Sequence, residues 1–186
     1  PIGVRLFDSL KESPLFGDPR HLTDEVLKEI RAIKDNTPLF LTAFYSTAHF
    51  PYAAPHPYYQ LFTAQDYNGP FLFQKNPELS GDSVSQEDVR QVRGLYDGAL
   101  KSIDVQLARI FAELRQRGIW DETLIIVTAD HGEDLYEDGM MQGHGEHLKG
   151  ENVLHVPLIL KLPRGWSAPN RINYLSRSID LAPTVA

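Results

Sequence analysis

The sequence contains no cysteine. Disulfides, thiolate metal sites and a cysteine nucleophile are therefore excluded within these residues, while the redox compartment stays open. Basic residues are also outnumbered, because 18 Lys and Arg stand against 25 Asp and Glu and give a net charge of −7. Without a basic run to neutralise phosphates, we expect no nucleic-acid partner. The apolar runs are too short to cross a bilayer, so we expect no membrane span in this chain.

The remaining composition is that of a folded domain. The chain has 186 residues, of which 42% are hydrophobic and 23% charged. This is enough for one core or for a large piece of one domain. The first residue is Pro1 rather than Met, and residues 184–186 lie inside a pattern that predicts the start of a helix. We therefore expect the chain to be a piece of a longer protein.

Apolar runs and helical spacings alternate along the chain. A helix is predicted over 23–34, and a longer one from Ser85 to a stop at Gly118. Apolar runs predict buried strands over three segments, with a candidate fourth: 39–45, 123–128, 155–161 and 176–179. Residues 1–20 are predicted to be loop, and a further helix to start over 180–183. This alternation predicts an α/β fold with a mostly parallel, mixed sheet flanked by helices.

A segment rich in Pro, Tyr, Asn and Gly covers residues 46–82. Loops of this length inside a compact domain are uncommon and usually serve function. We therefore interpret 46–82 as a long active-site loop region. Its aromatic residues, such as Tyr52, are predicted to pack within the loop rather than to form a platform for substrate.

Polar side chains follow two of the predicted strands. Asp130 and His131 come directly after the second strand, and His49 follows the first. Ligands of open α/β sheets bind beyond the carboxyl ends of the strands, so these side chains are candidates for one site. A carboxylate next to an imidazole suits Zn, Mn or another transition ion, and tolerates a harder ion if more carboxylates join. The alternative is that Asp130 caps the next segment and His131 lies on the surface.

Two further basic side chains are candidates for the same site. His144 stands between two glycines, which suggests a tight loop that brings an imidazole close to a ligand. Lys149 follows shortly afterwards and is also within reach. Taken singly, both residues are as well explained as solvated surface side chains. His49, taken singly, is equally well explained as a structural histidine before the extended pair Phe50-Pro51.

Taken together and in order, these motifs resemble a known family. The resemblance is carried by six segments: Ala48-His49-Phe50-Pro51 with Pro55 after it, the predicted helix that contains Tyr96 and Asp104, Thr128-Ala129-Asp130-His131-Gly132-Glu133, Gly143-His144-Gly145, Val156-Pro157-Leu158-Ile159 and Ser178-Ile179-Asp180-Leu181-Ala182-Pro183-Thr184. They are similar to the later part of a sulfatase, a family of the alkaline phosphatase superfamily. The resemblance runs from about residue 23 to the end and implies an alkaline-phosphatase-like α/β fold.

The resemblance implies a role for each candidate residue. Asp130 resembles the family's late metal-binding aspartate, and His131 occupies the adjacent ligand position. The implied cofactor is one divalent metal ion, with calcium first and Mn, Zn or Mg as alternatives. His49 resembles the catalytic histidine that contacts the sulfate or the leaving-group oxygen. His144 is placed near a second catalytic, sulfate-contacting position, for which Lys149 is the competitor.

The resemblance also implies that part of the catalytic machinery lies elsewhere. The sulfatase nucleophile is a formylglycine, made from the Cys or Ser of a Cys/Ser-x-Pro-x-Arg motif near the start of the family's domain, where the early metal aspartates also lie. We expect no such motif within residues 1–186. We therefore expect residues 1–186 to be a partial catalytic domain, with the nucleophile and formylglycine in an N-terminal half outside them. The isolated chain is expected to be inactive.

The function implied is the metal-dependent hydrolysis of sulfate esters, with a small-molecule or glycan ester as substrate. Two alternatives within the superfamily stay open: a phosphodiester or phosphonate hydrolase, and a phosphoglycerol or phosphoethanolamine transferase. A non-catalytic binding module, in which Asp130 and the histidines are incidental, is the third alternative. The resemblance further implies an extracytoplasmic enzyme, periplasmic or attached to a membrane.

Overall fold

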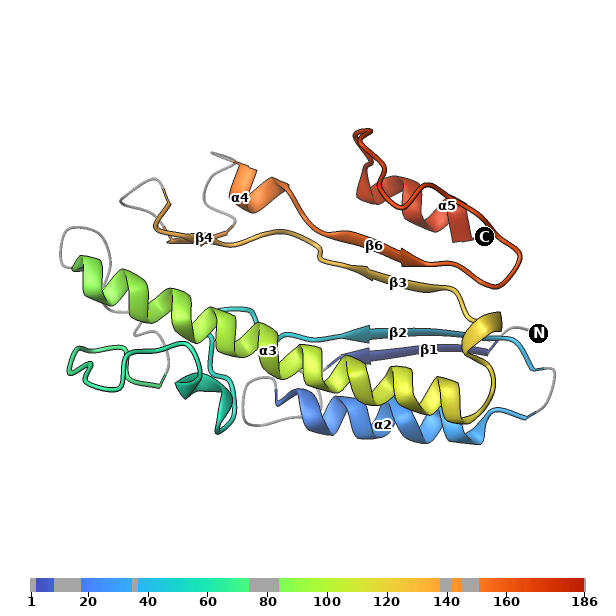
Figure 1. Ribbon diagram of the computed structural model, residues 1–186, viewed down its shortest axis with the longest axis horizontal. Helices are drawn as coiled ribbons and strands as arrows, with labels where there is room; N and C mark the ends of the chain where they lie inside the picture. The colour runs from blue at the N-terminus through green and yellow to red at the C-terminus, as the bar shows by residue number, and fades with distance from the viewer. Residues whose placement is uncertain are drawn as a thin grey trace.

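The computed structural model describes residues 3–8, 18–34, 37–73, 84–137, 142–144 and 151–185. The elements follow one another as β1 (Gly3–Asp8), α2 (Pro19–Ala32), β2 (Leu39–Phe44), η1 (Tyr58–Gln60), α3 (Gln86–Gln116), η3 (Trp120–Glu122), β3 (Ile125–Thr128), β4 (Asp134–Leu135), β5 (Gln142–Gly143), α4 (Glu151–Leu154), β6 (Leu158–Lys161), η4 (Ser178–Asp180) and α5 (Leu181–Val185). The strands lie in a layer between α2 and α3 on one side and α4 and α5 on the other (Figure 1). No helix in these ranges is long and apolar enough to cross a bilayer.

The two long helices begin at side chains that cap them. Ser85 accepts a hydrogen bond from the backbone N–H of Asp88, whose carboxylate accepts the N–H of Ser85 in return. This capping box, and Gly118 at φ +73° past the other end, confirm the predicted limits of α3. The predicted start of the first helix at residue 23 is too late. It begins at Pro19 because Asp18 accepts the backbone N–H of Arg20, which makes Asp18 the cap.

The strands form three pairs in the described part of the chain. β1 pairs with β2 in parallel, from Gly3 opposite Leu39 to Asp8 opposite Phe44. β3 with β6, and β4 with β5, are antiparallel. The predicted strands at 39–45, 123–128 and 155–161 are confirmed as β2, β3 and β6, and the α/β class is confirmed as well. One of the three pairs is parallel and two are antiparallel, each as a separate two-stranded sheet.

Two local predictions are wrong. Residues 1–20 are not all loop, because 3–8 form β1, which is held by a partner more than thirty positions away and therefore leaves no local period. The candidate strand at 176–179 is instead irregular backbone at 176–177 followed by the first two residues of the 3-10 helix η4. There the backbone N–H of Asp180 donates to the carbonyl of Arg177, and their side chains pair at 3.3 Å, so local bonds replace strand pairing.

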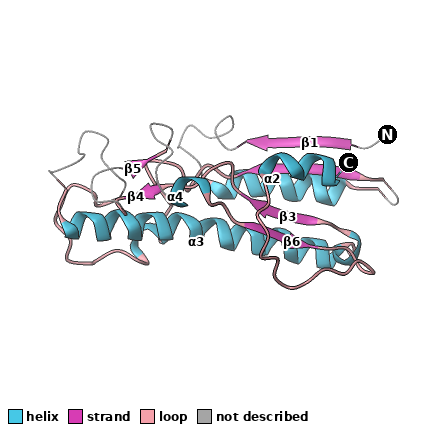
Figure 2. Cartoon of the chain, turned by 90° about the horizontal axis from the view of Figure 1, so that it is seen from above, coloured by secondary structure: helices cyan, strands magenta, loops and turns pink. Residues whose placement is uncertain are grey.

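The segment 46–73 packs against α3 rather than standing free, as the two views of the chain show (Figure 2). Gly94 and Gly98 make this possible, because a Cβ there would lie 2.4 Å from the carbonyl oxygens of Phe62 and Tyr58 respectively. The rest of the predicted loop, 74–82, lies outside the residues that the structure describes.

Two clusters of buried side chains hold these elements. The first joins the segment 46–73, the N-terminal half of α3 and the residues around β4; its members are Tyr52, Tyr67, Phe71, Val89, Val92, Leu95, Leu135 and Tyr136. The second joins α2 to the C-terminal half of α3 through Val26, Ile30 and Leu114. Tyr52 is wholly buried, as predicted for a loop-packing aromatic. The candidate site lies beside the first cluster.

Candidate functional site

Three histidines from distant parts of the chain meet at one place. His49 follows β2, His131 follows β3 and His144 follows β5. The rings of His131 and His144 stack with centroids 3.8 Å apart, and the ring of His49 meets that of His144 edge-on at 4.9 Å. The convergence expected from the ends of the strands is therefore present in the structure.

The imidazole of His131 is oriented by its own backbone. Its Nδ1 donates to the carbonyl of Gly132 at 2.9 Å, which leaves Nε2 as the nitrogen with a lone pair in the neutral ring. That Nε2 lies 3.6 Å from Oδ2 of Asp130. Oδ1 of Asp130 accepts the backbone N–H of His131 at 3.1 Å, so the carboxylate is anchored as well. A carboxylate oxygen and an imidazole nitrogen thus face the same point, and both are donors that a divalent cation accepts.

The turn that carries this pair is fixed by a glycine. A Cβ on Gly132 would lie only 1.8 Å from the carbonyl oxygen of Asn152, so no other residue fits here without displacing α4. The N–H of Gly132 donates to the carbonyl of Val153 at 2.7 Å. Val153 is itself buried, which ties the turn to the body of the protein.

His49 is held in a similar way at the other side of the site. Its backbone N–H donates to the carbonyl of Ser46 at 2.9 Å, which closes a turn after β2. Its Nδ1 donates to the carbonyl of Phe50 at 2.8 Å. The side chain is exposed. Nε2 is therefore the ring nitrogen at which His49 can exchange a proton with a ligand.

Glu133 is a member of the site that the sequence did not single out. Its carboxylate is 5% exposed, and Oε2 lies 3.4 Å from Nδ1 of His144. Tyr52, at φ +60°, sends its hydroxyl toward the same carboxylate, and burial together with the negative charge of Glu133 raises the pKa of that hydroxyl. The signal in the sequence was its place directly after Asp130-His131-Gly132, at the end of a strand.

A short hairpin brings Glu133 and His144 together. β4 pairs with β5 so that Asp134 faces Gly143. The helix α3 anchors this hairpin, because Nε of Arg93 donates to the carbonyl of Leu135 at 3.1 Å and its guanidinium lies 3.5 Å from Glu137.

The ligand set is incomplete within the described ranges. No group of three or more His, Cys, Asp or Glu side chains there is arranged to hold a metal ion. The candidate Lys149 lies outside the described residues. The donor chemistry of Asp130 and His131 fits a divalent ion, but two donors are fewer than a bound ion normally takes from a protein.

The nucleophile motif needs one correction. Ser167-Ala168-Pro169-Asn170-Arg171 matches the letters of Ser-x-Pro-x-Arg, although we expected that motif only outside these residues. This segment is an exposed loop after β6, and the chain reaches it by running away from β4 (Figure 1). It therefore does not supply a nucleophile to the site formed by the three histidines.

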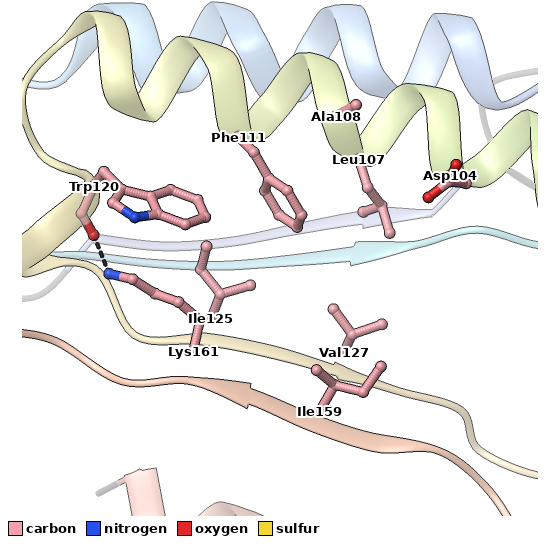
Figure 3. Close-up of a pocket in the computed structure, with 9 residues that line it drawn as sticks. All are labelled: Asp104, Leu107, Ala108, Phe111, Trp120, Ile125, Val127, Ile159 and Lys161. Atoms are coloured by element: carbon pink, nitrogen blue, oxygen red, sulfur yellow. Dashed lines mark hydrogen bonds between the residues drawn. The ribbon is translucent and has the colours of Figure 1, made fainter. Parts of the chain in front are cut away.

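A hollow lies apart from this site. It has a volume of about 290 Å³ and lies between α3 and the β3–β6 pair (Figure 3). Its walls are mostly apolar: Asp104, Leu107, Ala108, Phe111, Trp120, Ile125, Val127, Ile159 and Lys161. At one end the ammonium of Lys161 donates to the carbonyl of Trp120. None of the three histidines lines it.

Comparison with solved structures shows the same fold elsewhere. A phosphonate monoester hydrolase from Silicibacter pomeroyi superposes with a TM-score of 0.62 over 84% of this chain and 34% of that chain, at 24% identity. The phosphonate monoester hydrolase of Agrobacterium radiobacter gives a TM-score of 0.60 over 77% and 32%, also at 24% identity. At this identity the likeness shows the fold alone, and it confirms the alkaline-phosphatase-like α/β architecture.

Comparison of sequences points the same way. The multifunctional alkaline phosphatase superfamily protein PehA of Trinickia caryophylli is 29% identical over 91% of this chain and 37% of its own length. Human arylsulfatase A is 29% identical over 59% of this chain and 22% of its own. The chain thus spans little more than a third of these relatives at most. The sequence model of the sulfatase family matches residues 5–186. The chain therefore belongs to the sulfatase family, within the alkaline phosphatase superfamily.

Proposed function

We propose that the protein containing this chain is a metal-dependent hydrolase of sulfate esters, with a small-molecule or glycan ester as substrate. The observation that carries the proposal is the meeting of His49, His131 and His144 beside Asp130 in a chain of the sulfatase family. Hydrolysis of such an ester needs charge neutralised on the non-bridging oxygens and a proton for the leaving oxygen. Cationic and titratable side chains gathered at one point meet both needs.

Asp130 and His131 are the residues that would hold the metal ion. The carboxylate would contribute an oxygen and negative charge, and His131 would contribute the Nε2 lone pair left free by its bond to Gly132. The oxygen suits calcium or magnesium, whereas the imidazole nitrogen suits manganese or zinc. When bound, the ion supplies positive charge to the ester oxygens. The remaining ligands would come from residues outside the described ranges.

His49 is proposed as the group that gives a proton to the leaving oxygen. The carbonyl of Phe50 accepts from Nδ1 whether the ring is neutral or charged, so the proton is gained and lost at Nε2. His144 is proposed to contact the non-bridging oxygens of the ester, with Lys149 as the alternative for that contact. The segment 46–82 is proposed to border the active site, because it carries His49 there.

The nucleophile is proposed to lie in a part of the protein outside residues 1–186. The family resemblance implies a formylglycine there, and the chain covers 37% of the relative PehA. We accordingly treat 1–186 as a partial catalytic domain that is inactive alone. An extracytoplasmic location is proposed as well, since a relative of this chain is the extracellular sulfatase SULF-1 homolog of Drosophila melanogaster, at 26% identity.

The test uses the full-length protein and a pair of aryl and alkyl sulfates whose leaving groups differ widely in pKa. His49→Ala should lower turnover of the alkyl sulfate about a hundredfold to ten-thousandfold, and turnover of the aryl sulfate much less, because a good leaving group needs little protonation. Metal content should stay near that of the wild type. Equal losses on both esters would make His49 a binding residue, and loss of the metal would make it a ligand.

Phosphonate or phosphodiester hydrolysis is the second candidate. It is favoured by the names of two solved structures with this fold, both phosphonate monoester hydrolases. PehA, whose match covers 91% of this chain, is named a multifunctional member of the superfamily, which is compatible with it. Assaying the same full-length protein on a matched phenyl sulfate and phenyl phosphonate separates the two. A kcat/KM higher on the sulfate supports the first proposal, and the reverse order supports the second.

A further inference from the structure

We propose that Glu133 is a positioning residue for His144: its buried carboxylate holds the Nδ1 side of that ring, so that Nε2 faces the substrate. This inference rests on the proposed function for what the ring then contacts. The orientation itself rests on the geometry of the hairpin alone.

The register of the hairpin sets the pair. Asp134 faces Gly143 and Leu135 faces Gln142 in an antiparallel ladder. Each step outward adds one residue on each side, so the next position places Glu133 opposite His144. Residues opposite each other in such a ladder have neighbouring side chains. The observed 3.4 Å between Oε2 of Glu133 and Nδ1 of His144 agrees with this register.

Burial favours a hydrogen bond between Glu133 and His144. The side chain of Glu133 is 5% exposed and that of His144 is 25% exposed. A buried carboxylate is strongly unfavourable unless a donor is paired with it. Within the described residues, Oε1 of Glu133, Nδ1 of His144 and the hydroxyl of Tyr52 are all buried without a hydrogen bond of normal geometry. A small rotation of these side chains lets His144 donate to one carboxylate oxygen and Tyr52 to the other, which satisfies all three.

The surroundings leave the His144 ring little other choice. The ring of His131 covers it at 3.8 Å, and that of His49 meets it at 4.9 Å. Gly143 has φ +89°, and a Cβ there would lie 3.6 Å from Oε1 of Glu133. The two nitrogens of an imidazole flank one ring carbon, and their outward N–H bond and lone pair point in widely divergent directions. Holding Nδ1 against Glu133 therefore directs Nε2 away from the hairpin.

The first measurement reads the orientation without using activity. Full-length protein with ¹⁵N-labelled histidine is studied at pH values well above the ordinary histidine pKa of about 6.5, where rings are neutral. The His144 signals are assigned by their loss in His144→Gln. We expect His144 to carry its hydrogen on Nδ1 and to lose this preference in Glu133→Ala. A wild-type ring with its hydrogen on Nε2 overturns the proposal, whether or not Glu133→Ala folds.

The second measurement reads the consequence for turnover. Glu133→Gln keeps an oxygen that accepts from Nδ1, whereas Glu133→Ala does not. We expect kcat/KM on an aryl sulfate to fall about 10- to 100-fold in Glu133→Ala, as for other residues that orient a functional histidine, and to be partly restored in Glu133→Gln. Glu122→Gln, an exposed acid beyond the end of α3, is the matched control and should leave the rate unchanged.

The outcomes separate the two proposals. An active wild type whose His144 tautomer and rates ignore Glu133→Ala overturns the positioning role and leaves the proposed function standing. A wild type without activity on any sulfate or phosphonate, but with a tautomer that follows Glu133, overturns the proposed function and leaves the positioning role standing. Equal losses in Glu133→Gln and Glu133→Ala, with an unchanged tautomer, would reduce Glu133 to a structural role and overturn the proposal.

Discussion

The two ends of α3 face very different surroundings. Around its N-terminal half, Tyr52, Phe71 and Leu95 are wholly buried, and the three histidines lie close by. Around its C-terminal half, the pair β3–β6 leaves apolar side chains open to solvent, with Ile159 61% exposed and Leu175 beyond it 99% exposed. The candidate site therefore lies where this chain supplies its own packing. We call the surroundings of the N-terminal half of α3 the site end, and those of its C-terminal half the β6 end.

The difference teaches which parts of the molecule are complete in themselves. The tyrosines of the site end are buried by other side chains of this chain, whereas the β6 end exposes an apolar strand that a folded protein normally covers. A chain that spans 37% of the relative PehA is expected to leave such a surface for the remainder of a domain. We therefore expect substitutions at the site end to be costly in any context, and those at the β6 end to depend on the length of the protein.

The largest effect on stability is expected for a core leucine of the site end. Leu95→Ala should lower the free energy of unfolding by about 2–5 kcal/mol, because it opens a cavity among side chains that cannot close it. Leu160→Ala, at a position that is 41% exposed, should cost less than about 1 kcal/mol in residues 1–186. Urea denaturation measures both. A loss for Leu160→Ala as large as that for Leu95→Ala would break the comparison.

Leu95→Ala and Leu160→Ala can also be compared in the longer protein. There Leu160→Ala should become about as costly as an ordinary core substitution, since the β6 face would be covered. Leu95→Ala should keep its cost, because its surroundings already come from this chain. If Leu160→Ala stays mild in the longer protein, the β6 face is a free surface.

Substitution of two glycines should lower the stability by less than Leu95→Ala does, and the two can be compared with each other. Gly132→Ala should cost about 1–3 kcal/mol, since its Cβ would press on the carbonyl of Asn152. Gly165→Ala meets no neighbour within 4 Å and is unfavourable only through its φ of +89°, at about 1 kcal/mol. Thermal unfolding should show a larger drop in melting temperature for Gly132→Ala than for Gly165→Ala. Equal shifts would show that the turn after β3 is not tightly held by α4.

Alkaline conditions should weaken the packing of the site end. Burial, with the charge of Glu133, raises the pKa of Tyr52, and burial raises that of Tyr96. A raised pKa in the folded state stabilises the protein fully below the unfolded value of about 10, and this contribution is lost as the pH rises above it. Each such tyrosine should lower the stability by about 1.4 kcal/mol per pH unit there. Tyr52→Phe should flatten the loss, and an unchanged slope would contradict the burial.

A small effect is expected at the cap of α3. Ser85→Ala removes the acceptor for the N–H of Asp88 and should cost about 1 kcal/mol. The loss should be independent of the length of the protein, because the capping box lies within the site end. Urea unfolding of the variant in both lengths checks this, and a loss confined to one length would argue against a self-contained end.

The elements that the sequence predicted are those with local causes. α3 could be predicted because Ser85 and Gly118 mark its ends, and β3 because its apolar run is continuous. β1 could not, since its cause is pairing with β2 across the whole of α2. The sequence predicts a strand where η4 lies, because one hydrogen bond between Asp180 and Arg177 leaves no periodic pattern of apolar residues that would mark a 3-10 helix.

The same distinction applies to the site. His49, Asp130 and His131 could be predicted because each follows a strand, and His144 because glycines flank it. Glu133 could not be assigned a role, since its partner is set by the register of a hairpin of two residues on each side. So short a hairpin gives no alternation from which a strand could be read.

The most direct test of the site is Asp130→Ala in the full-length protein, with metal content and turnover of a sulfate ester measured on the same samples. The variant removes both an oxygen donor and a negative charge, so metal and activity should be lost together. Asp104→Ala, an exposed aspartate on α3 that pairs with Lys101, is the control and should keep both. A fully active Asp130→Ala protein with normal metal content would contradict the account.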